Sequence, residues 1–147
     1  MKFKKSYYLF FTVTLFFSVL MFFSNNQNCS SLNIHATYIV VGNADLYFFF
    51  MVFNLLLASV YLMIEQFQIK LHQLFCNIHT YTTLVLQLIF FFYNYKNNTE
   101  NQFNIFETVD YNTRLMLVLL MIIMIQILLI INIFVSLIKR LSNSASQ

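Results

Sequence analysis

Three residues whose side chains bind soft metals lie close together in the middle of the chain. His72, Cys76 and His79 are four and three residues apart, so a continuous helix would place all three on one face, as the start of a zinc site requires. Three ligands leave a tetrahedral metal site incomplete. Histidine is common at membrane surfaces and free cysteine is usually buried, so the pattern favours a polar helix start with a buried cysteine over a metal site.

Composition excludes the nucleotide chemistry that depends on glycine-rich loops. Gly42 is the only glycine of the 147 residues, which rules out glycine-rich phosphate loops and dinucleotide fingerprints. No Ser-His-Asp constellation is expected, because the arrangement of helices described below separates His72 and His79 from the aspartates. We therefore predict no catalytic residues and identify no small-molecule substrate. No nucleic-acid site is expected either, because the basic N-terminus carries only three lysines.

The composition is that of an integral membrane protein. The chain is 60% hydrophobic and 9% charged, with a mean hydropathy of +0.72, whereas soluble domains are about 25% charged. A bilayer crossing takes about 20 apolar residues, and four such runs cover residues 7–23, 44–64, 74–93 and 115–138. We expect a single all-α membrane domain over residues 1–147, a bundle of four transmembrane helices. Residues 24–33 are predicted to form a polar loop, and residues 34–45 a short lead-in to the second helix.

The orientation follows from the basic residues, because Lys and Arg near membrane ends are retained in the cytoplasm. With four crossings, six of them fall on one side and two on the other. The six are Lys2, Lys4, Lys5, Lys70, Lys139 and Arg140, and the two are Lys96 and Arg114. The split predicts that both termini are cytoplasmic. We also expect the protein to lie in the inner (plasma) membrane of a bacterium.

Three side-chain amides fall near the middle of predicted helices. Asn54, Gln87 and Gln126 should lie at similar depth, and an unpaired amide in hydrocarbon is costly. We expect at least two of them to face the interior and to form hydrogen bonds between helices.

The stretch from Ile34 to Leu46, IHATYIVVGNADL, resembles the hallmark of subunit I of haem-copper (cytochrome c) oxidases, His-Asp-Thr-Tyr-Tyr/Phe-Val-Val-Ala-His-Phe-His-Tyr. Residues 70–84 and 114–134 resemble later helices of that subunit more weakly. The resemblance would cover the C-terminal part of the large subunit, and it implies a haem-binding helix that begins near this stretch.

The departures from the hallmark change the expected function. The two family histidines that ligate different haem irons are replaced by Asn43 and Asp45, and the outer His-Asp pair survives as His35-Ala36. Neither an amide nor a carboxylate is an ordinary axial haem ligand. We therefore expect a non-catalytic relative without haem or copper, with a structural or interaction role among lipid, other membrane proteins or copies of itself. The alternative is a haem- or metal-binding electron-transfer protein with His35, His72 or His79 as ligand.

Overall fold

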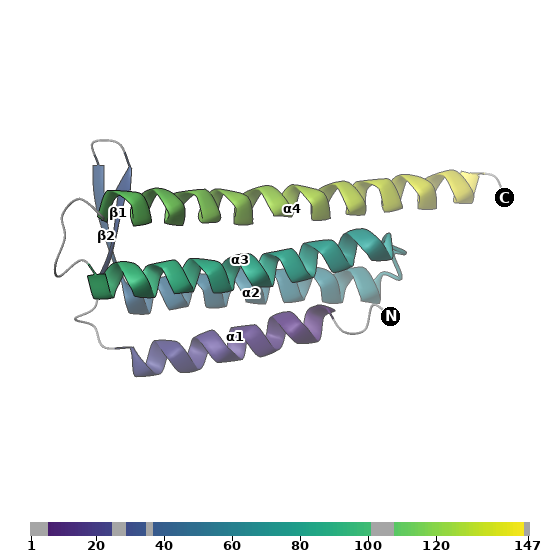
Figure 1. The fold of residues 1–147 in the computed structure, drawn as a ribbon. Helices are drawn as coiled ribbons and strands as arrows, with labels where there is room; N and C mark the ends of the chain where they lie inside the picture. Colours follow the sequence, from purple (N-terminus) through teal and green to yellow (C-terminus); the bar gives the residue numbers. More distant parts are fainter. Residues whose placement is uncertain (1–5, 25–28, 35–36, 101–107, 146–147) are drawn as a thin grey trace.

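The computed structural model describes residues 6–24, 29–34, 37–100 and 108–145. The elements follow in the order α1 (Ser6–Phe23), β1 (Cys29–Ile34), β2 (Thr37–Gly42), α2 (Asn43–Gln66), α3 (Gln73–Glu100) and α4 (Thr108–Ala145). Helix α1 packs against α2 and helix α3 against α4, and a β-hairpin stands at one end of the helices (Figure 1). We call this the hairpin end, and the opposite end, where residues 67–72 join α2 to α3, the connection end.

All four helices are long and apolar enough to cross a membrane, as predicted from the hydropathy. The start of α1 and the end of α4 both lie at the connection end (Figure 1). Helix α4 has 38 residues, about 57 Å at 1.5 Å per residue, which exceeds a hydrocarbon core of about 30 Å. It therefore reaches beyond the apolar layer.

Helices α3 and α4 extend past their apolar runs. Helix α3 continues to Glu100 rather than ending near residue 93, and α4 spans Thr108–Ala145 rather than residues 115–138. Hydropathy marks only the part of a helix that lies in hydrocarbon. Polar residues such as Asn and Lys continue the same backbone hydrogen bonding beyond it.

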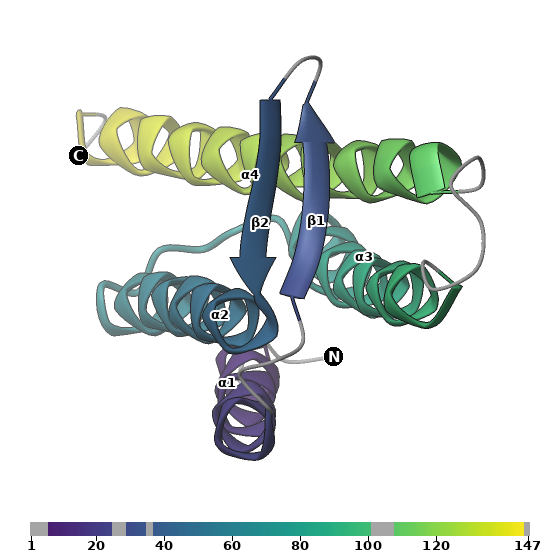
Figure 2. The same ribbon diagram turned by 90° about the vertical axis from the view of Figure 1, so that its left-hand side faces the viewer.

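The prediction of a loop and a lead-in before α2 was wrong. β1 and β2 pair in antiparallel fashion, with Cys29 opposite Gly42 and Ile34 opposite Thr37. The sequence TYIVVG of β2 is rich in β-branched and aromatic residues, which favour strands. β1 contacts α3 and α4, while β2 leads into α2, so the hairpin crosses the helix ends (Figure 2). His35 lies between the strands, outside the described residues.

The interior contains two clusters of buried side chains. Helix α1 packs closely against α2, and α3 against α4. The cluster toward the hairpin end comprises Phe17, Leu46, Phe50, Phe90, Leu115, Val118 and Ile122. The cluster toward the connection end comprises Phe10, Leu57, Ala58, Tyr61, Ile64, Leu71, Cys76 and Leu129.

Helix α2 ends in a Schellman motif. The Gln68 N–H donates to the Glu65 carbonyl and the Ile69 N–H to the Ile64 carbonyl, both at 3.0 Å. Gln68 takes a left-handed backbone conformation with φ of 52°, the conformation that such a cap requires and that glycine usually supplies. The turn directs the chain back toward α3.

Candidate functional site

One face of α3 carries polar side chains into the bundle. The spacing of three and four residues keeps these positions on one side of a helix. Apolar burial alone would predict leucine or phenylalanine at such positions, yet the buried polar and thiol residues of this face are Cys76, His79, Thr80, Thr83, Gln87 and Asn94. Polar groups within a membrane helix are expensive and usually mark a functional or structural site.

The imidazole of His79 is fully enclosed, with an exposed fraction of 0%. Its Nε2 lies 2.9 Å from Oε1 of Gln126 on α4, and its Nδ1 lies 2.8 Å from the hydroxyl of Tyr61 on α2. The Gln126 amide donates from Nε2 to the Ile122 carbonyl, which leaves Oε1 to face His79. Since that oxygen only accepts, Nε2 of His79 donates, and a neutral ring then accepts the Tyr61 hydroxyl at Nδ1.

Asn54 and Gln87 form a second link between α2 and α3. The Asn54 Nδ2 donates to Gln87 Oε1 at 3.2 Å, and the Gln87 Nε2 donates to Asn54 Oδ1 at 3.3 Å. The Asn54 Nδ2 also donates to the Phe50 carbonyl at 2.7 Å. Both amides are buried, so each is satisfied by the other rather than by water.

A third link fastens the start of α3 to α4. The backbone N–H of His72 donates to Asn132 Oδ1 at 3.0 Å, and Asn132 Nδ2 donates to the His72 carbonyl at 3.2 Å. The same Nδ2 lies 3.5 Å from the sulfur of Cys76. Asn132 Oδ1 thus accepts a hydrogen bond from one of the N–H groups that have no partner within the helix at its start.

Three buried polar atoms on the same face of α3 have no hydrogen-bond partner among the described residues. They are Thr80 Oγ1, Thr83 Oγ1 and Asn94 Oδ1. The two hydroxyls lie between the His79 and Gln87 links along α3, so the polar face is continuous through the middle of the bundle.

The predicted metal candidates are not brought together. His72 precedes α3 and is exposed, with its ring 5.0 Å from that of Phe75. Cys76 is buried beside Asn132, and both ring nitrogens of His79 are engaged in hydrogen bonds. Within the part of the chain that the structure describes, no three His, Cys, Asp or Glu residues are grouped as a metal site would need.

Asn43 and Asp45, where the resembled hallmark has histidines, lie at the start of α2. Asn43 is the first residue of the helix and is buried, whereas Asp45 is exposed. The difference fits two positions about 200° apart on a helix. The N-cap is Gly42, and a Cβ added there would lie 3.1 Å from Asp45 Oδ2, so the carboxylate folds over the helix start, where the dipole favours negative charge.

The sequence interpretation missed five members of the polar interior. They are all buried but were not singled out, unlike the three amides and the metal candidates, and they are Tyr61, Thr80, Thr83, Asn94 and Asn132. The sequence signal for this interior is the recurrence of polar residues at helical spacing along residues 76–94. Treating the segment as one apolar run hides that spacing.

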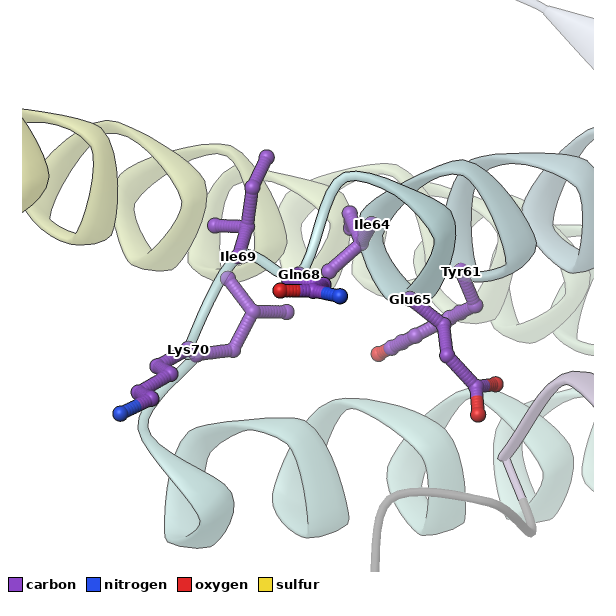
Figure 3. A pocket seen from close by; sticks show the side chains of 7 residues that line it. Tyr61, Ile64, Glu65, Gln68, Ile69 and Lys70 are labelled. Atoms are coloured by element: carbon purple, nitrogen blue, oxygen red, sulfur yellow. The ribbon is translucent and has the colours of Figure 1, made fainter.

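A cavity of about 280 Å³ opens beside the Tyr61 end of the network. Its wall is formed by the end of α2 and the connection to α3, at Tyr61, Ile64, Glu65, Gln68, Ile69, Lys70 and Leu71 (Figure 3). Phe10 of α1 stacks on Tyr61 with ring centroids 5.6 Å apart. The phenol therefore lies between this cavity, the α1 ring and His79.

No family model, curated protein or solved structure matches this chain. The fold and the interior nevertheless define its class. It is an integral membrane protein, a bundle of four helices able to cross a bilayer, with an interior crossed by hydrogen bonds between helices.

Proposed function

We propose that this chain is a non-catalytic protein of the bacterial inner (plasma) membrane, a short relative of haem-copper oxidase subunit I. In this proposal it has a structural or interaction role in a membrane complex, with other membrane proteins or further copies of itself as partners. Both termini face the cytoplasm. The lineage rests on the hallmark-like stretch from residue 34 to residue 46.

The proposal rests on which imidazole nitrogens could ligate a haem iron. Asn43 and Asp45 stand where the family has imidazoles, and neither is an ordinary axial ligand. Among the described residues, His79 is the one deeply buried imidazole, and it uses Nδ1 toward Tyr61 and Nε2 toward Gln126. Ligation of iron by His79 would require one of these two bonds to break.

The same bonds support a structural role. Links between α2 and α3 and between α3 and α4 run through amide and imidazole groups. Such bonds fix the register of one helix against the next, because a shift of one residue would leave buried polar groups unpaired. Bonds that fix the helix register in this way support a structural role for the bundle.

The orientation is supported by charge. Lys70, Lys139 and Arg140 lie at the connection end, where α1 begins and α4 ends (Figure 1), and basic residues are retained in the cytoplasm. Reporter fusions after Lys70 and Arg140 should score cytoplasmic, and a fusion after Glu107 should score external. A cytoplasmic score after Glu107 would overturn this orientation.

The direct test is purification of the full chain in a mild detergent, followed by an optical spectrum, metal analysis and oxygen consumption with a reduced donor. We expect no stoichiometric haem or copper and no oxygen reduction. The matched variant Asn43→His with Asp45→His restores imidazoles at both family positions and serves as the comparison. A stoichiometric Soret band that disappears in His35→Ala or His79→Ala would instead establish the electron-transfer alternative.

The interaction role is tested separately by chemical cross-linking in the native membrane and by mass measurement of the intact complex. A defined complex, either with itself or with other membrane proteins, is expected. A chain that remains monomeric in both measurements would contradict the interaction role.

A further inference from the structure

A second cavity lies at the connection end, between the α2–α3 connection and α4. Its volume is about 420 Å³, and it is lined by Gln68, Lys70, Ser136, Lys139 and Arg140. The lining thus combines three cations with an amide and a hydroxyl. None of these lining residues is acidic, so the positive charge is not neutralised from within the cavity.

Helix α4 supplies three of the five groups from one face. Ser136, Lys139 and Arg140 are related by three and four residues, which brings them together on a helix surface. The Arg140 guanidinium is held in place, because its Nη1 donates to the Phe67 carbonyl at 2.9 Å. An arginine has five N–H donors, so most of them are left for a ligand after this bond.

The opposite wall comes from the cap of α2. Gln68 lines the cavity from a left-handed backbone conformation, with φ of 52°, where glycine would avoid the steric cost. Strained backbone positions often accompany functional sites. The glutamine amide adds a neutral donor opposite the cations of α4.

Lys70 borders both this cavity and the neighbouring one beside Tyr61, whereas Glu65 borders only the latter. The Lys70 side chain extends away from Glu65 (Figure 3). The nearest carboxylate on α2 therefore does not belong to the basic cavity, and the two cavities differ in charge.

Clustered Lys, Arg, amide and hydroxyl donors around one space match the oxygens of a phosphate group. The surroundings indicate where that phosphate comes from. Phe67, Ile138 and Leu141 expose 64%, 62% and 68% of their surface beside these residues, so the cavity lies where apolar surface gives way to polar groups. Basic pockets between transmembrane helices at this depth suit lipid headgroups.

We propose that the cavity formed by Gln68, Lys70, Ser136, Lys139 and Arg140 binds the phosphate of an anionic phospholipid headgroup. The acyl chains then lie along the exposed apolar surface of α4. The inference does not depend on the oxidase resemblance or on which side of the membrane the connection end faces.

The test uses the full chain in detergent micelles, with bound lipid counted by mass measurement of the intact protein. Phosphatidylglycerol, phosphatidylcholine and inorganic phosphate are the three probes. We expect saturable binding of phosphatidylglycerol and weaker binding of phosphatidylcholine. The variant Lys70→Gln with Lys139→Gln should weaken phosphatidylglycerol binding about tenfold or more, because each surface cation contributes to the attraction of anionic lipid.

The double variant leaves Arg140 and its bond to Phe67 in place, so the connection end keeps its tie to α4. The matched control, Lys4→Gln with Lys5→Gln, removes the same charge from the basic N-terminus and should change binding less than twofold. Equal losses in the two variants would overturn the site, because bulk charge would then explain the binding. Equal binding of phosphatidylcholine would also overturn it, and inorganic phosphate bound as tightly as phosphatidylglycerol would overturn the assignment to lipid.

Discussion

The two halves of the bundle interior are built from different chemistry. Toward the hairpin end, aromatic rings fill the space, with centroid separations of 5.0 Å for Phe17–Phe91 and 5.2 Å for both Phe50–Phe90 and Phe50–Phe91. Toward the connection end, hydrogen bonds join Tyr61, His79 and Gln126. We refer to these as the aromatic half and the hydrogen-bonded half.

The difference shows how helices can hold together where burial from water is not the driving force. In lipid, helix association depends on packing and on hydrogen bonds between helices. The aromatic half uses the close fit of large rings, which adapts to small shifts. The hydrogen-bonded half uses directional bonds, which do not. Asn54 and Gln87 lie at the boundary between the two halves.

The largest expected effect is in the aromatic half. Phe50 is 1% exposed and meets rings from α1 and α3. Replacement by alanine leaves a cavity that these rings cannot close, and we expect Phe50→Ala to lower the free energy of unfolding by about 3 kcal/mol. The measurement is unfolding in bicelles by steric trapping. The control Phe48→Ala removes a 51% exposed ring, and an equal loss there would contradict the assigned core.

A smaller effect is expected in the hydrogen-bonded half. His79→Leu leaves the Tyr61 hydroxyl and the Gln126 carbonyl oxygen without their partner, at a cost of about 1 to 3 kcal/mol. A double-mutant cycle with Tyr61→Phe isolates the Tyr61–His79 bond. We expect a coupling energy of about 1 kcal/mol, within the range for membrane proteins. Additive effects of the two variants would mean that the bond contributes nothing.

The smallest effect concerns the boundary pair. Asn54→Leu leaves the Gln87 amide without its partner, and Gln87→Leu leaves Asn54 with only its bond to the Phe50 carbonyl, whereas the double variant removes both amides. The double variant should therefore be less destabilised than the sum of the single variants, with a coupling of about 0.6 kcal/mol. Ser59→Ala is the control, because its exposed hydroxyl bonds only within α2, to the Leu55 carbonyl. If the double variant is destabilised by the full sum of the single variants, the two amides do not stabilise each other and the prediction is wrong.

Much of the fold was predictable because lipid imposes a simple rule. A membrane crossing must satisfy its backbone internally, so four apolar runs become four helices. The hairpin of residues 29–42 was not predicted, because a short strand pair leaves no apolar run and its β-branched segment was read as the approach to α2. Asn54, Gln87 and Gln126 stood out as lone amides in apolar helices, whereas Tyr61 and Asn132 did not.

The sequence by itself determined that this is a membrane protein of four helices, because hydropathy and length decide whether a segment can lie in hydrocarbon. It also placed three side-chain amides, Asn54, Gln87 and Gln126, within apolar runs. Only the tertiary structure decided that His79 meets Tyr61 and Gln126, and that Lys70 joins Lys139 and Arg140 around one cavity. These residues are brought together by the packing of separate helices, and the spacing of residues along one helix carries no information about which side chains face it from another.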